Sequence, residues 1–210
     1  MISFNNVSMR YADGFEALKS VSFQLADGEM AFLTGHSGAG KSTLLKLITI
    51  AERPASGEIL FKGLNLARVL GKNIYKVRRD IGVVYQNHRL LPEKNVFENV
   101  ALPLRIIGTD YQELAKRVRA AISKVGLSGS EKKFPNSLSS GEQQRVGIAR
   151  AVVSKPSLLL ADEPTGNLDS ISAETVFQLL TQLAKSTGVG ALIATHNLDL
   201  AKRMDRIVRL

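Results

Sequence analysis

Hydrophobic and polar positions alternate over the first part of the chain, which is the pattern of half-buried β-strands. The alternation covers residues 2–24 around a turn at Ala12-Asp13-Gly14, and a second β-like stretch covers residues 57–63. Continuous hydrophobic runs predict strands buried on both faces, as in a parallel sheet, and they lie at 30–34, 157–161 and 190–195. A last short strand is expected at 206–208. The chain should therefore begin with a β-region and continue into a parallel sheet.

Helical spacing of hydrophobic residues appears between these strands. One predicted helix directly follows residue 43. Three others cover 96–107, 111–125 and roughly 172–185. From about residue 92 to residue 156 only helical spacing is found, which indicates a helical insert. We therefore expect one α/β domain over residues 1–210, with a core made of 1–91 and 157–210 and a helical subdomain at about 92–156.

Composition limits the compartment and the chemistry. The 210 residues include 44% hydrophobic residues, enough for one substantial core. No apolar run approaches the roughly 18 to 20 residues that cross a bilayer, and residues 1–10 do not resemble a secretory signal, so we expect a protein on the cytosolic side. The chain has no cysteine, which excludes disulfides and thiol catalysis.

The net charge of +9 is concentrated in one stretch. Residues 62–94 contain eight basic and two acidic side chains, and this excess of positive charge makes up two thirds of the net charge of the chain. Aromatic residues make up only 6% of the chain and do not interleave with this stretch as a base-stacking surface would require. The charge favours proximity to an anionic membrane surface over nucleic acid, and a solvated face without a partner is an equal alternative.

A glycine-rich segment between a predicted strand and a predicted helix has the spacing of a phosphate-binding loop. Glycines at such a turn let backbone N–H groups converge on phosphate oxygens at a helix N-terminus. Lys41 is expected to meet the β- and γ-phosphates, and the Ser42 hydroxyl to bind Mg²⁺. The loop comprises Gly35, His36, Ser37, Gly38, Ala39, Gly40, Lys41, Ser42 and Thr43.

Two acidic residues follow the buried run at 157–161. Because ligands bind at the carboxyl ends of parallel strands, Asp162 is expected to bind Mg²⁺ directly or through water, and Glu163 to polarise or orient an attacking water. His196 follows the next predicted strand, so it should lie at the same sheet edge, near the γ-phosphate or the water. A strand that ends in acids is weak evidence without the phosphate loop.

Ser139 and Glu142 have the spacing of a capping box and predict the start of a helix. A capped helix N-terminus can also bind an anion, although a cap alone would explain the pair. This segment reads Leu138-Ser139-Ser140-Gly141-Glu142-Gln143-Gln144-Arg145-Val146.

The ordered set of motifs resembles the ATP-binding-cassette ATPases. It comprises the phosphate loop, Val83-Val84-Tyr85-Gln86, the segment at 138–146, Leu158-Leu159-Leu160-Ala161-Asp162-Glu163-Pro164-Thr165, Asn167-Leu168-Asp169 and His196. The resemblance extends over residues 2–210. It implies a P-loop core with a mainly parallel sheet, an N-terminal antiparallel β-subdomain and an inserted helical subdomain that carries the signature motif. The implied cofactors are ATP and Mg²⁺.

The resemblance also implies roles for further residues. Tyr11 would stack on adenine, Gln86 would contact Mg²⁺ and report to a membrane partner, and residues 167–169 would contact a second copy of the chain. In a head-to-tail dimer the signature residues Ser139, Gly141 and Glu142 would act on the nucleotide of the other subunit. An integral membrane protein would bind near residues 86–103.

The signature departs from the family's usual L-S-G-G-Q, because Ser140 and Glu142 replace a glycine and a glutamine. If position 140 needs a positive φ, the Ser140 Cβ would restrict closure, and Ser140→Gly is then expected to raise the ATPase rate. On this resemblance, the short C-terminal extension usual in the family is expected to be missing after residue 210.

Within the family, residues 28–41 and 139–153 are most similar to cassettes of bacterial cell division. These would act at the cytoplasmic face of the inner membrane and couple hydrolysis to control of cell-wall hydrolases. The alternatives are the ATPase of a lipoprotein-releasing or efflux complex, a nucleic-acid- or ribosome-associated cassette, and a regulatory module that binds ATP without hydrolysing it.

Overall fold

Two β-sheets form the framework of the protein, whose computed structural model describes residues 1–201 and 206–210. The first sheet is antiparallel, has the order β2-β1-β4-β5 and consists of β1 (Ile2–Arg10), β2 (Glu16–Leu25), β4 (Ser56–Phe61) and β5 (Leu64–Asn65). The second is parallel, has the order β6-β7-β8-β3-β9 and consists of β3 (Met30–Thr34), β6 (Ile81–Val84), β7 (Leu158–Asp162), β8 (Gly190–Ala194) and β9 (Ile207–Arg209). The predicted fold class, with an antiparallel N-terminal sheet and a parallel core sheet, is confirmed.

The helices agree with the hydrophobic spacing wherever that spacing was regular. They are α1 (Lys41–Ile48), α2 (Ile74–Arg79), α3 (Val96–Ile106), α4 (Tyr111–Lys124), α5 (Ser140–Val152), α6 (Ser170–Thr187) and α7 (Leu198–Ala201), with 3₁₀ turns at Leu66–Arg68, Gly71–Asn73 and Pro135–Ser137. Sequence analysis did not predict α2, α7 or the 3₁₀ turns. These elements have six residues or fewer, too few to establish a hydrophobic period.

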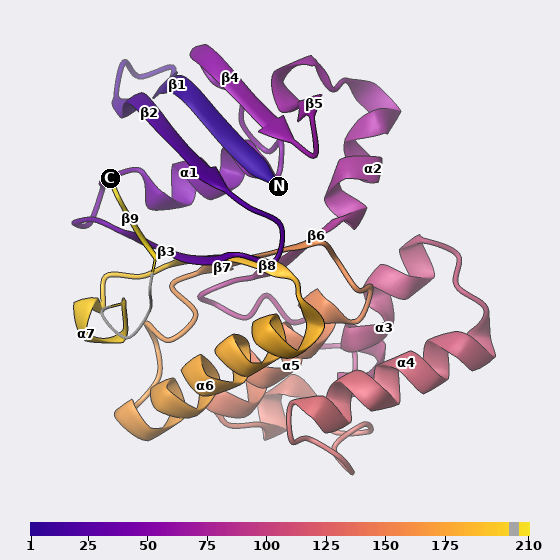
Figure 1. Cartoon of the computed structure of the whole chain (residues 1–210). Coiled ribbons are helices and arrows are strands. Elements are labelled where there is room, and N and C mark those ends of the chain that lie inside the picture. The colour runs from indigo at the N-terminus through magenta and orange to yellow at the C-terminus, as the bar shows by residue number, and fades with distance from the viewer. Residues whose placement is uncertain (202–205) are drawn as a thin grey trace.

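The parallel sheet is covered on both faces, which explains its continuous hydrophobic runs. Helix α1 lies between the two sheets, and α3, α4, α5 and α6 lie on the opposite side (Figure 1). Alternate strand residues serve the two layers: Leu158 and Leu160 face the cluster around α1, whereas Leu159 belongs to the cluster formed with the helices. The strands β3, β7 and β8 therefore have no solvated face, as expected inside a parallel sheet, whereas the edge strand β9 is partly exposed.

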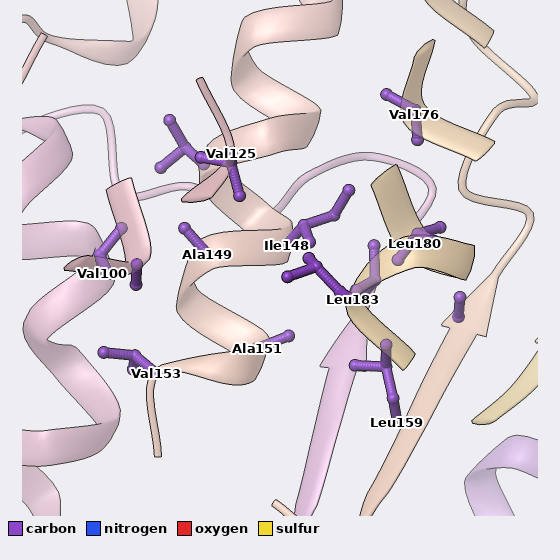
Figure 2. Close-up of a cluster of buried hydrophobic side chains, with 14 of the residues drawn as sticks. Val100, Val125, Ile148, Ala149, Ala151, Val153, Leu159, Val176, Leu180 and Leu183 are labelled. Atoms are coloured by element: carbon purple, nitrogen blue, oxygen red, sulfur yellow. The ribbon is translucent and has the colours of Figure 1, made fainter. Parts of the chain in front are cut away.

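The larger hydrophobic cluster fixes the helical part against the core sheet. This cluster includes Val100 of α3, Ile148 of α5, Leu180 of α6 and Leu159 of β7, which are all 1% exposed or less (Figure 2). Burying a side chain of this size contributes about 1.5 to 3 kcal/mol. The cluster is continuous from the helices to the core sheet, and the division into a core and a helical subdomain at about 92–156 remains a prediction.

Part of the basic stretch at 62–94 has structural contacts. The Arg78 guanidinium donates to the carbonyl oxygens of Thr49 and Ile50 at 2.9 and 3.1 Å, and so covers the carboxyl end of α1. Lys62 Nζ lies 3.0 Å from Asp80 Oδ2. These two charges therefore stabilise the fold, whereas an anionic membrane surface as a partner remains a prediction. Within 1–201 and 206–210, the structure has no helix of the length and hydrophobicity that a bilayer crossing requires.

Candidate functional site

The loop between β3 and α1 has backbone geometry that only glycine adopts easily. Gly38 and Gly40 have φ values of 83° and 93°. A Cβ on Gly40 would lie 2.3 Å from the carbonyl oxygen of Ala17, so the loop packs tightly on β2 at this point. A Cβ on Gly38 would meet no atom within 4 Å. The loop is thus fixed on one side and open on the other, where an anion can approach the N-terminus of α1.

The Lys41 side chain is 6% exposed and is oriented into this loop. Its Nζ donates to the carbonyl oxygens of Gly35 at 2.9 Å and His36 at 3.1 Å, and it lies 3.6 Å from Glu163 Oε1. A buried ammonium group that contacts neutral carbonyl oxygens at the N-terminus of α1 suits a polyanion, because a phosphate would replace these contacts with charged ones.

Ser42 and Asp162 come together although 120 residues separate them, because α1 begins and β7 ends at this edge of the sheet. The Ser42 hydroxyl donates to Asp162 Oδ1 at 3.0 Å. Burial raises the pKa of the Asp162 carboxyl, and the nearby Glu163 charge adds to the rise, whereas the bond from Ser42 opposes it. A hydroxyl beside a carboxylate is the oxygen set that Mg²⁺ binds, and a cation would relieve the cost of burying this charge.

Glu163 and His196 face each other from the ends of β7 and β8. His196 Nδ1 contacts Glu163 Oε2, and the Glu163 backbone N–H donates to the Ala194 carbonyl at 2.9 Å. Glu163 has a φ of 45°, an uncommon value for a residue with a side chain. The backbone therefore turns sharply after Asp162, and the turn directs the carboxylate toward both Lys41 and His196.

Gln86 follows β6 and lies at the same edge. Its Nε2 donates to Asn167 Oδ1 at 3.4 Å, and Asn167 Nδ2 donates to Asn87 Oδ1 at 2.8 Å. Within this chain Asn167 pairs with the segment after β6. Contact of residues 167–169 with a second copy remains a prediction. Asp169 caps α6 by accepting from the N–H groups of Ile171 and Ser172, each at 3.0 Å.

Most of the phosphate loop lines one open cavity of about 400 Å³ together with Gln86 and Glu163, whereas Asp162 and His196 do not line it. A second cavity of about 380 Å³ lies on the other side of Glu163 and is also lined by His196 and Asn197. Neither cavity is lined by Ser139, Gly141 or Glu142. The first is lined by Phe15, Ser37, Gly38, Gly40, Lys41, Ser42, Thr43, Gln86 and Glu163.

Tyr11 is half-buried beside this site. Its hydroxyl forms a 2.9 Å hydrogen bond with Thr43 Oγ1, and the Lys46 ammonium lies 5.8 Å from its ring centroid. Its ring packs against the hydrophobic cluster around α1. Adenine stacking by Tyr11 remains a prediction.

The start of α5 has the expected capping box. Ser139 Oγ accepts from the Glu142 N–H at 3.3 Å, and Glu142 Oε2 accepts from the Ser139 N–H at 2.8 Å. The bond from the Ser139 backbone lowers the pKa of Glu142. Ser140 is the first residue of the helix and has helical backbone, so the positive φ on which the expected gain from Ser140→Gly depends is not found. The physical reason given for that expectation is wrong, because position 140 lies in the first turn of α5 and has no positive φ that a glycine would relieve.

Sequence reasoning missed Arg150, which connects α5 to the segment after Gln86. Its Nη2 and Nη1 donate to the carbonyl oxygens of His88 at 2.6 Å and Arg89 at 2.7 Å. His88 and Arg89 have φ values of 51° and 48°. No local signal predicts this contact, because the partners are about sixty residues apart. Phe15, which lines the first cavity, was missed because a single aromatic residue after a turn forms no motif.

Comparisons with known proteins show the family of the chain. Residues 18–166 match the family described as ABC transporter. The chain is 52% identical over 203 residues to the cell division ATP-binding protein FtsE of Escherichia coli (strain K12), covering 97% of this chain and 91% of that protein. It is 44% identical over 213 residues to the lipoprotein-releasing system ATP-binding protein LolD 1 of Rhodospirillum rubrum, covering 100% of this chain and 94% of that protein. A dimeric ATP-binding cassette solved in a post-hydrolysis state with ADP and phosphate has a TM-score of 0.90 and 35% identity, covering 100% of this chain and 94% of that one.

Proposed function

The chain belongs to the ABC transporter family of ATPases, and from this premise we propose that it is the Mg²⁺-dependent, ATP-hydrolysing subunit of a bacterial cell-division complex. Its partner would be an FtsX-like integral membrane protein, and hydrolysis on the cytoplasmic face of the inner membrane would control cell-wall hydrolases. The observation that carries the enzymatic part is that Lys41, Ser42, Asp162 and Glu163 converge at one sheet edge.

The residues around the first cavity have complementary roles in this proposal. Lys41 would exchange its carbonyl contacts for the β- and γ-phosphates, and Ser42, Asp162 and Gln86 would hold Mg²⁺, which would neutralise phosphate charge when bound. Glu163 orients the attacking water or accepts its proton, and His196 keeps that carboxylate in place and lies beside the γ-phosphate. The direct contact between Glu163 and His196 supports this pairing.

A second copy of the chain completes each active site. The signature residues Ser139, Gly141 and Glu142 line neither cavity of their own chain, and Ser139 and Glu142 are committed to capping α5. In a head-to-tail dimer this capped N-terminus would meet the nucleotide held by the other copy, where its partial positive charge is useful. The dimeric state of the similar solved cassette supports the arrangement.

A groove between α2, β6 and α3 is the proposed site of the membrane partner. Its cavity measures about 730 Å³ and overlaps the predicted region at residues 86–103 through Leu102 and Pro103. Two large hydrophobic side chains are exposed on it, Tyr75 at 48% and Ile106 at 77%. Lys72, Arg79 and Lys155 also line the groove. A cytosolic helix of the partner that presents apolar and acidic residues would fit such a surface.

The test is affinity purification of Glu163→Gln from native membranes with ATP and Mg²⁺, followed by mass spectrometry. Loss of a general base typically costs about 10²- to 10⁴-fold in rate, so this variant is expected to bind ATP and remain in the closed dimer. Glu113→Gln, on the exposed start of α4, is the matched control and should keep the rate of the unaltered chain. Recovery of an FtsX-like protein would support the cell-division role, and an unchanged turnover of Glu163→Gln would contradict the role of Glu163.

The lipoprotein-releasing function is a second candidate. The identity of 44% to LolD 1 over the whole chain favours an ATPase of the same design with a different membrane partner. Recovery of a lipoprotein-releasing permease in the same purification would keep the ATPase mechanism and replace the cell-division role. Recovery of ribosomes or DNA without a membrane protein would favour the nucleic-acid-associated alternative.

A further inference from the structure

A cavity of about 410 Å³ lies where three helices end together, at the end of the core sheet opposite to the phosphate loop. Helices α4, α5 and α6 end at Lys124, Val152 and Thr187, and each of these residues lines the cavity. Pro156 and Val189 also line it, and they precede the parallel strands β7 and β8. The cavity shares no lining residue with the two cavities around the proposed active site, so it is a separate feature of the molecule.

The wall of this cavity is hydrophobic. Ala121 of α4, Val153 after α5 and Leu183 of α6 line it, and each is 6% exposed or less. Among the described residues that line it, only Thr187 adds an uncharged polar side chain, and its hydroxyl already donates to the Leu183 carbonyl at 2.7 Å. A peptide bound here would leave backbone N–H and C=O groups without partners, whereas a hydrocarbon chain needs none.

Three cationic side chains surround this wall without an acidic neighbour. Arg117, Lys124 and Lys155 line the cavity, and no acidic residue of the described chain lines it. Within residues 1–201 and 206–210, none of the three forms an ion pair. A helix C-terminus carries about half a negative charge, so the three helix ends offset only about half of the three positive charges. The remaining positive charge suits one carboxylate.

Two of these cations have features that the fold alone does not explain. Arg117 Nη2 donates to the Val153 carbonyl at 2.6 Å, but Arg117 Nε is buried and has no hydrogen-bond partner among the described residues. A buried donor without a partner destabilises a fold. Lys155 has a φ of 55°, a left-handed conformation that glycine or asparagine adopts with less strain. Basic side chains thus occupy two positions where stability alone would favour other residues.

We propose that this cavity binds a small amphipathic carboxylate of the fatty-acid type. Its hydrocarbon chain lies on the wall formed by α4, α5 and α6, and its carboxylate lies among Arg117, Lys124 and Lys155. The cavity volume is within the range of small-molecule sites, about 300 to 1,000 Å³. The inference goes beyond the proposed function and does not depend on it, because no residue of the nucleotide site takes part.

The first test compares octanoate, octanol and octylamine, which share a hydrocarbon chain and differ in the charge of the head group. Methyl NMR of the whole chain should show saturable shifts of Leu183 and Val189 with octanoate. Octanol should bind about 10- to 100-fold more weakly, because it cannot form charge-assisted hydrogen bonds, and octylamine should cause no shift. The methyl groups of Leu44, which is buried in α1 beside the phosphate loop, should not respond to any of the three.

Other results of this titration overturn the inference. Equal shifts with all three ligands would indicate an unspecific hydrophobic contact, and no shift of Leu183 or Val189 with octanoate would exclude the site. Shifts of Leu102 and Ile106 instead would assign octanoate to the groove between α2, β6 and α3, which those two residues line.

The second test removes charges at the cavity. Lys124→Gln should weaken octanoate binding about 2- to 5-fold and leave octanol binding unchanged, because a charge at the rim contributes modestly. Lys155→Asn should have the same effect, and asparagine tolerates the left-handed backbone at this position. Lys116→Gln, at an exposed position of α4 that does not line the cavity, is the matched control and should change neither ligand. Equal effects of Lys124→Gln and Lys116→Gln on octanoate would contradict the proposal.

Discussion

Asp162 shows at the scale of one residue how a functional group can work against the stability of the fold. Burial raises its pKa, so the folded chain binds this proton more tightly than the unfolded chain does. The charged form therefore costs free energy of folding, and the cost develops as the pH rises from the unfolded pKa through the raised folded one. Above that window the cost is fully present.

Asp162→Asn is therefore expected to raise the melting temperature of the nucleotide-free chain near about pH 7. The advantage should shrink as the pH falls toward the ordinary aspartate pKa of about 4, because the raised pKa lets the Asp162 carboxyl of the unaltered chain take up a proton and lose its charge. Thermal melts followed by circular dichroism across this pH range would measure the effect. The same variant should lose Mg²⁺-dependent hydrolysis. A lower melting temperature at neutral pH would mean that the bond from Ser42 outweighs the cost of burial.

At the scale of elements, the contact between α5 and the segment after β6 joins two parts of the proposed machinery. Arg150 lies on the helix that begins at the signature, and it holds the backbone of two residues with positive φ just after Gln86. The two carbonyl groups would lack these donors without the guanidinium. A movement of α5 should therefore be transmitted to Gln86, and a movement of the segment at Gln86 should be transmitted to α5.

Arg150→Ala is expected to lower the free energy of unfolding by about 3 kcal/mol, because it removes two charge-assisted hydrogen bonds. Urea unfolding would measure the loss. Arg119→Ala, at an exposed position of α4, is the matched control and should change stability by no more than about 0.5 kcal/mol. Equal effects of the two substitutions would show that the bonds from Arg150 add nothing beyond a surface charge.

At the scale of the whole molecule, the signature residues do not line the cavity at the phosphate loop, and the proposed function therefore needs two copies acting together. Lys41→Ala should inactivate a site through its loop. Ser140→Trp should inactivate the site to which the altered copy contributes its signature. Ser140 is exposed in the free chain, and a large side chain there would block the nucleotide held by the other copy.

Each of these variants alone should be inactive, and an equimolar mixture should recover about a quarter of the original rate, since half of the dimers are mixed and each contains one intact site. Phosphate release would be measured for each variant and for the mixture. A mixture as inactive as its components would contradict a shared site and indicate that each copy hydrolyses ATP alone.

The sequence by itself determined the elements and the chemistry that depend on local order. Strands buried on both faces, regular helices, the capping box and the phosphate loop all follow from residues within a few positions of one another, and so do the two acidic residues that follow a buried strand. The family resemblance rested on the order of these motifs, and the family match supports it.

Only the tertiary structure decided which distant residues meet. The bond from Ser42 to Asp162, the contact of His196 with Glu163 and the guanidinium contacts of Arg150 join segments that are 33 to 120 residues apart. The exposure of Phe15 and the helical backbone of Ser140 were likewise not legible in the sequence. The physical reason is that hydrophobic periodicity and turn chemistry are local, whereas the position of a side chain in a cavity depends on how sheets and helices pack.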